Sequence, residues 1–319
     1  MNEGNSSPAL RAYWHPVARC ADLNDKPLAV LLLNERLALF RMPQGVVCMQ
    51  DLCIHRGTPL SLGWIDGDHV VCAYHGWNYN GSGVCTRIPA LSPDRPIPEK
   101  ARVPAYRCAE RYGLVWVCMG HPRAPIPECP EYNDCEYTSY LVGPFTWECG
   151  AARSIENFVD QAHFPWVHEG ILGDRSCPET FPVHVQRCAE ELQYSFVDRP
   201  NPMHPIAHRR VYRIYRPFAI HQRKERENGQ VETSFFVVTP HSSKRSTNYL
   251  YVLRNFRLSD DELRKRYELD VKIMLQDKVI LENQRPEELP LDLSEELHIK
   301  GPDAVAIEYR RMLGELGVK

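Results

Sequence analysis

Two short segments combine cysteine and histidine at spacings that suit metal binding. The first is Cys53-Ile-His55-Arg-Gly and the second is Cys72-Ala-Tyr-His75-Gly-Trp. Sixteen residues separate His55 from Cys72, and each segment contains a glycine, which favours a turn. Two such loops facing each other would offer two thiolates and two imidazoles to one metal centre.

These four side chains suit two kinds of metal site. A Cys2His2 set can hold a tetrahedral structural zinc ion, but zinc sites usually repeat a Cys-x2–4-Cys unit, and a single residue lies between Cys53 and His55. A two-iron cluster fits better, with Cys53 and Cys72 on one iron and His55 and His75 on the other. A chance grouping of core cysteines with unrelated histidines is the third alternative.

A second group of polar residues begins about eighty positions later. Asn157, Asp160 and His163 follow one another at intervals of three, which predicts one face of an amphipathic helix capped by Ser154. His168 would point about 140° away from His163 on an unbroken helix, so we expect a break at Pro165. Two histidines and one carboxylate form the iron site of non-haem Fe(II) oxygenases, and the carboxylate can come from a distant segment.

Both groups resemble motifs of one known family. C-x-H-x16-C-x2-H followed by Gly-Trp resembles the Rieske motif, with Ile54 where many members carry proline. N-x2-D-x2-H-x4-H resembles the mononuclear-iron motif of the terminal oxygenase (α) subunits of Rieske non-haem iron oxygenases. On these motifs the chain is identified as a member of that family, of the homotrimeric phthalate-oxygenase-like type.

The resemblance implies two iron cofactors and a ligand set for each. A 2Fe-2S Rieske cluster would be bound by Cys53, His55, Cys72 and His75. A mononuclear Fe(II) would be bound by His163, His168 and a carboxylate on a long helix near the C-terminus, for which the family pattern points to Asp277, with Glu282 as the rival.

Two more residues receive roles from the resemblance alone. Asp160 would lie between the two metal centres and bond both His163 of its own chain and His75 of the neighbouring subunit. Asn157 would lie near the iron without being a reliable ligand. This arrangement implies a homotrimer in which electrons cross from one subunit to the next, head to tail.

The implied activity is an oxygenation that depends on partner proteins. A separate reductase fed by NAD(P)H, with or without a ferredoxin, would supply electrons, because the chain has no FAD- or NADH-binding motif. O2 would then hydroxylate or oxidatively demethylate an aromatic, heterocyclic or alkaloid small molecule. The alternative is an electron-transfer or sensor protein whose C-terminal domain only binds a ligand.

The elements expected around these residues divide the chain into two domains, 1–135 and 136–319. Short β-rich runs predict an all-β first domain, and no stretch before position 120 has helical periodicity. Strands are expected at 182–188, 192–198, 209–222, 231–239 and 246–257, followed by a long helix capped by Ser259 and a short helix at 303–316. With the resemblance, this predicts an α+β fold: a Rieske domain, then a helix-grip (START-like) domain with a curved antiparallel sheet over a long helix.

The strands at 209–257 are expected to line a substrate cavity. The candidate wall residues are His204, His208, Tyr212, Tyr215, His221, Phe235, Thr239 and Tyr249. A basic run covers the same region: Arg209, Arg210, Arg213, Arg216, Arg223, Lys224 and Arg226. Three hypotheses suit it: a solvated face, a docking surface for an acidic electron donor, or a clamp for a substrate carboxylate.

Composition sets the remaining expectations. With 38 Lys and Arg against 41 Asp and Glu, the charge does not favour a nucleic-acid partner, and no run of about 18 apolar residues predicts a membrane span. The polar, acidic N-terminus does not resemble a secretory signal, so a cytoplasmic location is expected. In a reducing compartment, most of the 12 cysteines are expected to be buried free thiols.

Overall fold

The computed structural model describes residues 8–198 and 207–318, which form two compact units. The N-terminal unit is Arg11–Ile126, and the C-terminal unit consists of the described residues after Ile126 together with residues 8–10. The chain passes from one unit to the other between Ile126 and Pro127. The sequence-based prediction put the domain boundary at 135/136. Among the described helices, none is both long and apolar enough to cross a membrane.

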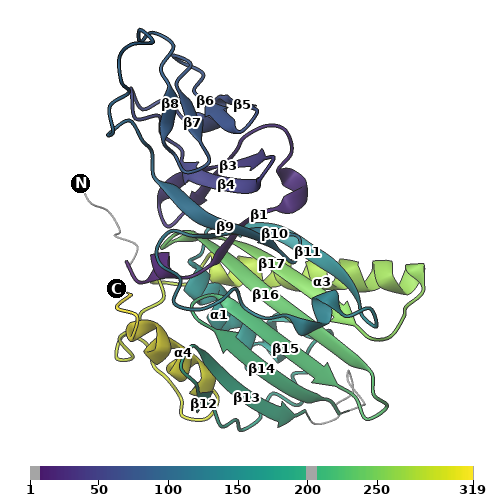
Figure 1. Cartoon of the computed structure of the whole chain (residues 1–319). Helices are drawn as coiled ribbons and strands as arrows, with labels where there is room; N and C mark the ends of the chain where they lie inside the picture. The colour runs from purple at the N-terminus through teal and green to yellow at the C-terminus, as the bar shows by residue number, and fades with distance from the viewer. Residues whose placement is uncertain (1–7, 199–206, 319) are drawn as a thin grey trace. The chain divides into compact units, whose positions relative to one another are not determined.

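The N-terminal unit is built from two antiparallel sheets (Figure 1). The larger has the strand order β1 (His15–Arg19), β10 (Leu114–Cys118), β9 (Ala105–Arg111), β4 (Gly45–Gln50), β3 (Glu35–Met42), β2 (Leu28–Leu32). The smaller contains β5 (Trp64–Asp66), β6 (His69–Val71), β7 (Asn78–Asn80) and β8 (Cys85–Arg87). Helices among its described residues are three-residue 3-10 turns, and the expected β fold is confirmed.

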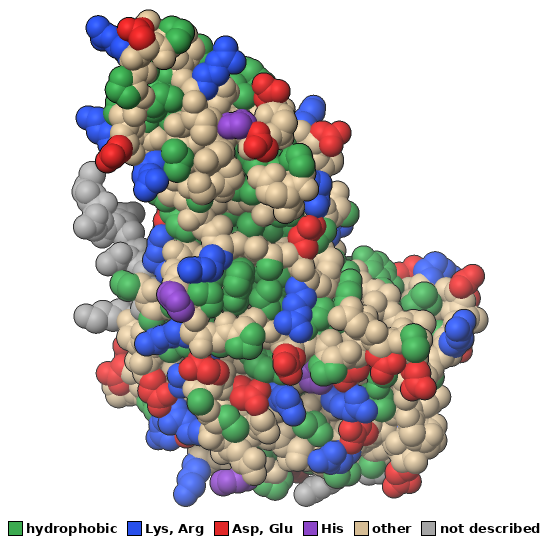
Figure 2. Space-filling view, in the orientation of Figure 1, with side chains coloured by type: hydrophobic (Ala, Val, Ile, Leu, Met, Phe, Trp, Pro, Cys, Tyr) green, Lys and Arg blue, Asp and Glu red, His purple; other side chains and the backbone are tan. Residues whose placement is uncertain are grey.

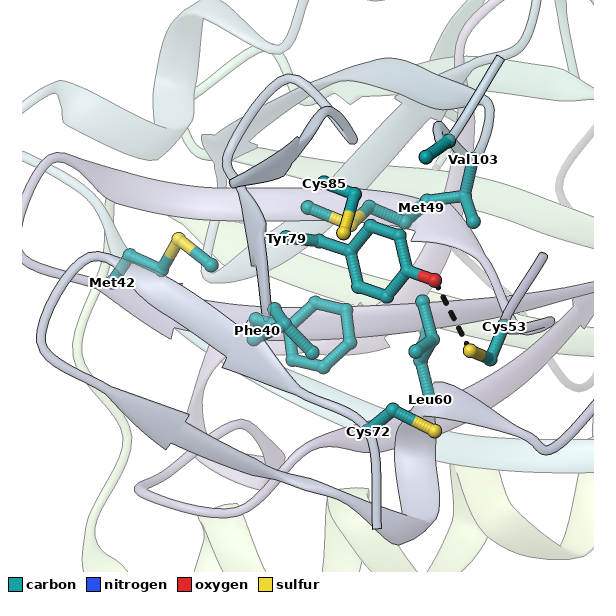
Figure 3. Packing of buried hydrophobic residues seen from close by; sticks show 12 residues of the cluster. Phe40, Met42, Met49, Cys53, Leu60, Cys72, Tyr79, Cys85 and Val103 are labelled. Carbon is teal, nitrogen blue, oxygen red and sulfur yellow. Dashed lines mark hydrogen bonds between the residues drawn. The ribbon is translucent and has the colours of Figure 1, made fainter. Parts of the chain in front are cut away.

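One hydrophobic cluster joins the smaller sheet to strands β3 and β4 (Figure 3). Tyr79 of β7 is fully buried in it, among Phe40, Met49 and Cys85. The hydroxyl group of Tyr79 points to the Sγ atom of Cys53, 3.1 Å away. The two candidate ligand cysteines, Cys53 and Cys72, are therefore part of the core that holds the unit together.

The C-terminal unit is a seven-stranded antiparallel sheet with helices packed on it (Figure 1). The strand order is β11 (Thr138–Trp147), β17 (Arg245–Arg254), β16 (Val231–Ser242), β15 (Ala219–Glu225), β14 (Arg209–Tyr215), β13 (Glu191–Val197), β12 (Gln186–Arg187). The helices are α1 (Ala151–Val159), α2 (Phe164–Val167), α3 (Asp260–Leu281) and α4 (Ala304–Gly314). The long α3 packs on β11 and α1, as expected for this α+β class.

Some elements differ from the sequence-based expectation. The strand expected at 209–222 is a hairpin, β14 and β15, because the chain turns at Arg216–Phe218 around Pro217, which has no N–H to donate to a ladder. Strand β11 was not predicted. Ser259 does cap α3, with Glu262 completing a capping box.

The helix expected around Asn157 both starts and ends earlier than predicted. Helix α1 begins after Gly150, so Ser154 is not its cap but a buried residue inside it. The helix ends at Val159, and Asp160 is already in extended backbone. Pro165 does not create the break, since it lies in the first turn of the separate helix α2.

Candidate metal centres

The two cysteine–histidine loops of the N-terminal unit have matching backbone turns. In the first, the Gly57 N–H donates to the Cys53 carbonyl at 2.9 Å; in the second, the Gly76 N–H donates to the Cys72 carbonyl at 3.0 Å. Both glycines have positive φ angles, 73° and 66°, which other residues adopt at a cost. Each glycine therefore lets its loop turn back after the cysteine and present the histidine.

The loops bring the two predicted histidine ligands next to each other and the two predicted cysteine ligands next to each other. The rings of His55 and His75 lie 4.5 Å apart between centroids, and Trp77 stacks on His55 at 4.6 Å. The cysteines are buried, whereas His75 is exposed and His55 half-buried. The iron held by the histidines would thus face the surface.

The donor atoms fit a Rieske cluster. The Nδ1 atom of His55 is buried and has no hydrogen-bond partner, which is costly unless a metal or other group occupies it. Burial and the neighbouring Cys53 raise the pKa of the Cys72 thiol, so a positive centre is needed to hold it as the thiolate. The two thiols and two imidazoles provide that ligand chemistry.

The second candidate centre lies in the C-terminal unit. The donor atoms of His163, His168 and Asp277 all lie within 4.8 Å of one another. The Asp277 Oδ1 atom is 3.0 Å from His168 Nε2 and 3.5 Å from His163 Nε2. These three atoms are buried without a hydrogen-bond partner, so the site fits one iron with two imidazoles and one carboxylate.

Short local elements direct both imidazoles to this point. His163 precedes α2 and His168 follows it, so one helical turn separates the rings. Asp160 accepts a hydrogen bond from His163 Nδ1 at 2.9 Å, and Gln276 accepts one from His168 Nδ1 at 2.9 Å. These bonds fix the tautomers in which Nε2 is free to bind a metal. The sequence had not singled out Gln276, whose position next to Asp277 was the available indication.

The charges around the centre shift two pKa values. Burial acts to raise the pKa of Asp160, but its hydrogen bond to His163 and two backbone N–H groups outweigh burial, and the pKa is lowered. Burial acts to lower the pKa of His168, but the Asp277 carboxylate outweighs it, and the pKa is raised. The lowered pKa keeps Asp160 in the carboxylate form that orients His163, and the raised pKa of His168 reflects the negative charge of Asp277, which would equally stabilise a metal cation beside the neutral imidazole.

The other predicted residues near the centre take different positions. Asn157 is on α1 and lines the cavity beside the three donor atoms. Glu282 ends α3 and accepts a hydrogen bond from the Glu148 backbone N–H at 2.8 Å, away from the group formed by His163, His168 and Asp277. The geometry therefore distinguishes Asp277 from its rival.

The cavity is lined by a different set of residues from the one expected. Its wall combines the three donor residues with one face of α3, parts of α1 and α2, and the inner face of β14–β17: Asn157, Phe158, His163, Phe164, His168, Leu172, Arg210, Gln222, Lys224, Ser234, Leu250, Val252, Arg266, Asp270, Ile273, Met274 and Asp277. None of the described candidates lines it, and His204 lies outside the described residues.

Strand register explains the difference. Tyr212 pairs with Gln222 on the inner face, but the Tyr212 hydroxyl accepts a hydrogen bond from Gln222, and Tyr212 does not line the cavity. His221 pairs with Phe235 on the opposite face, where it bonds the buried Glu131 at 2.8 Å. Side chains alternate between the two faces of a strand, and the sequence does not show which face borders the cavity. Two members of the basic run, Arg210 and Lys224, do line it.

Both units match known protein families. Residues 13–107 match the Rieske [2Fe-2S] domain, and residues 147–319 match the vanillate O-demethylase oxygenase C-terminal domain. The second match alone covers more than half of the chain. The chain belongs to the Rieske oxygenases.

This Rieske oxygenase is similar over its whole length to characterised demethylases. It is 34% identical to the methylxanthine N1-demethylase NdmA of Pseudomonas putida, over 96% of this chain and 89% of that protein. It is 27% identical to the methylxanthine N3-demethylase NdmB of the same organism, over 97% and 90%. The solved structure of Pseudomonas putida CBB5 NdmA with caffeine matches at a TM-score of 0.88 and 33% identity, covering 96% of this chain and 91% of that one.

These likenesses decide between the alternatives raised by the sequence. The chain is an enzyme of the Rieske oxygenase class with a 2Fe-2S cluster and a mononuclear non-haem iron. A zinc-stabilised module and a protein that only transfers electrons are excluded, because the matched families are a Rieske [2Fe-2S] domain and an oxygenase domain.

Proposed function

We propose that this Rieske oxygenase oxidatively demethylates an aromatic or heterocyclic small molecule at an iron held by His163, His168 and Asp277. The observation that carries the proposal is the three-residue donor group opening onto a cavity that is lined in part by apolar side chains. The full-length likeness to two N-demethylases supports demethylation over ring dihydroxylation.

The proposed reaction balances with two electrons from a partner. One atom of O2 enters the methyl C–H bond, and the other leaves as water with two electrons and two protons. The hydroxymethyl product then loses formaldehyde and leaves a free N–H or O–H on the substrate. When bound, the mononuclear iron supplies O2 activation, and the cluster supplies electrons one at a time.

The protein residues hold and orient these groups. We assign the cluster to Cys53, His55, Cys72 and His75, and the second iron to His163, His168 and Asp277. Asp160 orients His163 through the 2.9 Å bond to Nδ1, and Asn157 lines the cavity beside the iron. Phe158, Phe164, Ile273 and Met274 offer apolar contacts that suit a flat ring.

A head-to-tail homotrimer is part of the proposal. In the N-terminal unit, the exposed side chains of Ile54, Leu62, Trp64 and Tyr74 lie in or next to the loops that present the cluster ligands. In the C-terminal unit, exposed Trp166 lies between His163 and His168. Exposed large apolar groups at both centres support contact between one subunit's cluster and the next subunit's iron site. Asp160 would then bond His75 of the neighbour.

Electrons are proposed to come from a separate NAD(P)H-dependent reductase, directly or through a ferredoxin. The ladders between named strands of the described residues are all antiparallel, whereas dinucleotide-binding sheets are largely parallel. This supports a partner protein as the site of NAD(P)H oxidation.

Metal content tests the assignment of the iron ligands. Anaerobically reconstituted protein should hold three irons per chain, and Asp277→Ala should hold two while keeping the absorption spectrum of the cluster. Glu282→Ala is the matched control on the same helix and should keep three. Full iron content in Asp277→Ala would overturn the assignment.

Turnover tests the reaction. With a generic reductase, NADPH and labelled O2, a panel of methoxyarenes and N-methyl heterocycles should yield formaldehyde in a one-to-one ratio with the demethylated product. A labelled ring hydroxyl without formaldehyde would contradict demethylation and favour ring hydroxylation.

A further inference from the structure

Two protons must reach the iron site in each turnover of the proposed reaction, because one atom of O2 leaves as water. When a substrate is bound, the substrate cavity offers these protons little access. Its apolar side chains would pack against a bound ring and exclude water: Phe158, Phe164, Ile273 and Met274. Its ionic side chains are held in ion pairs: Arg210 with Asp198, Lys224 and Arg266 with Glu232, and Arg266 with Asp270. The protons therefore need a second way in.

A second cavity, of about 210 Å³, borders helix α1 in the same unit. Its wall combines residues of α1, of α4 and of the segment that joins α3 to α4, among them Arg153, Glu156, Asp160, Gln284, His298 and Arg310. Among the residues that the structure describes, Asn157 is the one that lines both cavities. The second cavity therefore approaches the iron ligands by a path that a bound substrate does not fill.

Unpaired polar atoms indicate that water belongs in the second cavity. Three side chains of its wall have a buried polar atom without a hydrogen-bond partner: Arg153 through Nε, Gln284 through Oε1 and His298 through Nδ1. Arg153 is 3% exposed, so bulk water does not satisfy its Nε atom. Buried polar groups of this kind bind ordered water, and one water occupies about 30 Å³ in the liquid. The cavity therefore has room for a chain of several waters.

The wall of the second cavity carries more negative than positive charge. It includes four carboxylates and two arginines: Glu156, Asp160, Glu296, Asp303, Arg153 and Arg310. Among the described residues, the cations that pair with these carboxylates are the same two arginines, at 2.5 to 2.9 Å, and the imidazole of His163. Four carboxylates against two arginines leave an excess of two negative charges, whereas acidic and basic side chains are interspersed on the face drawn in Figure 2. Such an excess favours protons in the cavity.

His298 lies where the second cavity meets the surface. The residue is half-buried, and its neighbours Leu297 and Ile299 are 89% and 53% exposed. Histidine is the side chain that gains and loses protons near neutral pH, so His298 can take a proton from solvent and pass it inwards. Asn157, which the two cavities share, can orient a water molecule because its amide both donates and accepts hydrogen bonds.

We propose that the second cavity holds a chain of water molecules that carries protons from His298 to Asn157, and from there to the oxygen atom that leaves as water. His298 releases one proton inwards at a time and is reprotonated from solvent, so two passages supply the two protons of each turnover. Asp160 carries no proton in this scheme, because its carboxylate accepts from His163 and from the Ala162 N–H. The inference rests on the proposed oxygenation for its two protons, and the water chain stands on the cavity alone.

A crystal structure of the holoenzyme tests the water chain without turnover. Ordered waters should bond His298 Nδ1 and Gln284 Oε1 and continue to Asn157. A cavity without ordered water between His298 and Asn157 would overturn the proposal.

Hydrogen peroxide separates proton supply from the rest of the reaction. One oxygen atom of H2O2 enters the methyl C–H bond and the other leaves as water, so neither electrons nor protons are drawn from outside. Ala306→Leu, which places a larger apolar side chain in the wall of the second cavity, should slow O2-driven formaldehyde release at least about tenfold. Its peroxide-driven rate, its KM for the substrate and its iron content should match the wild type. Ala304→Leu on the same helix, outside the cavity wall, is the matched control.

Solvent isotope and buffer effects identify protons as the limiting species. The substrate is the member of the panel above that releases formaldehyde fastest. The ratio of the O2-driven rates in H2O and D2O should rise in Ala306→Leu and in His298→Ala. Rising concentrations of the weak acid MES should restore the rate of His298→Ala, because a small buffer acid can replace the lost imidazole. Slower turnover with the wild-type isotope ratio would indicate slower electron transfer and overturn the proposal, as would an equal loss of rate with peroxide.

The water route and the proposed function fail in different ways. Ordered water from His298 to Asn157, without formaldehyde from any member of the panel, would leave the route standing and remove demethylation. Formaldehyde at the wild-type rate from both Ala306→Leu and His298→Ala would leave demethylation standing and remove the route.

Discussion

The hydroxyl group of Tyr79 is the one polar atom of its side chain, and it lies 3.1 Å from Cys53 Sγ inside an apolar cluster (Figure 3). Hydrogen bonds to the sulfur atoms of an iron–sulfur cluster stabilise its reduced, more negative state. We expect Tyr79→Phe to lower the reduction potential of the cluster by about 40 mV, the equivalent of about 1 kcal/mol for one electron.

A redox titration followed by electron paramagnetic resonance measures this shift. Tyr106→Phe is the matched control, because the Tyr106 hydroxyl bonds Glu35 in the same unit. An unchanged potential in Tyr79→Phe would show that the hydroxyl does not bond the cluster.

Asp160 acts on His163 rather than on the metal. Its carboxylate fixes the ring by accepting from Nδ1, and such supporting bonds to metal ligands typically contribute 10- to 100-fold in activity. Asp160→Asn should therefore keep three irons but slow reoxidation of the reduced cluster about 10- to 100-fold, measured by stopped-flow absorbance with substrate and O2. Loss of the mononuclear iron in this variant would instead indicate a structural role.

Helix α2 is only four residues long and depends on Gly173 for its position. A Cβ atom at Gly173 would lie 2.6 Å from the backbone N of Pro165 and 2.8 Å from the carbonyl carbon of Phe164. Gly173→Ala should push α2 and His168 away, destabilise the unit by about 1–3 kcal/mol and reduce iron content. Gly314→Ala meets nothing within 4 Å and serves as the control. Full iron content and stability in Gly173→Ala would contradict this account.

The 3-10 turn Pro130–Asn133 anchors the outer face of the sheet through Glu131. This buried carboxylate accepts from His221, Arg223 and Thr233 at 2.8, 2.9 and 3.0 Å. Burial acts to raise its pKa, but the bonds to His221 and Arg223 prevail and lower it to about 2. Because the folded pKa is below the unfolded value, the carboxylate stabilises the fold above about pH 4.5, and this contribution is lost as pH falls towards 2.

Glu131→Gln should consequently lower the free energy of unfolding by about 2–4 kcal/mol at pH 7. The difference from the wild type should shrink steadily below about pH 4.5, as measured by urea denaturation across pH. A difference that does not depend on pH would show that the carboxylate is not the charged partner of His221 and Arg223.

At the scale of the whole molecule, the head-to-tail trimer predicts that two inactive variants can complement each other. His75→Ala lacks a proposed cluster ligand and Asp277→Ala lacks a proposed iron ligand, so each alone should be inactive. Trimers reassembled from an equal mixture should regain about a quarter of wild-type activity, because about one interface in four pairs an intact cluster with an intact iron site. Electron transfer within one chain would give no activity in the mixture.

The outcome of the sequence predictions depended on how local each feature is. Two short turns, each with a glycine at the same place, present Cys53, His55, Cys72 and His75. The spacing of the motif was therefore enough to predict that these four residues lie close together. The cap of α3 at Ser259 is likewise local. The hairpin at Pro217 and the early end of α1 were missed, because tertiary packing overrode the apolar periodicity.

The sequence by itself indicated the kind of chemistry, since the spacing of Cys53, His55, Cys72 and His75 favours a two-iron cluster over zinc, and a histidine pair found together with that motif suits a second iron. Only the tertiary structure decided that Asp277 rather than Glu282 joins the histidines, and that Arg210 and Lys224 face the cavity while His221 does not. The physical reason is the alternation of side chains along a strand. A shift of one residue moves a side chain to the other face, and only packing against α3 determines which face borders the cavity.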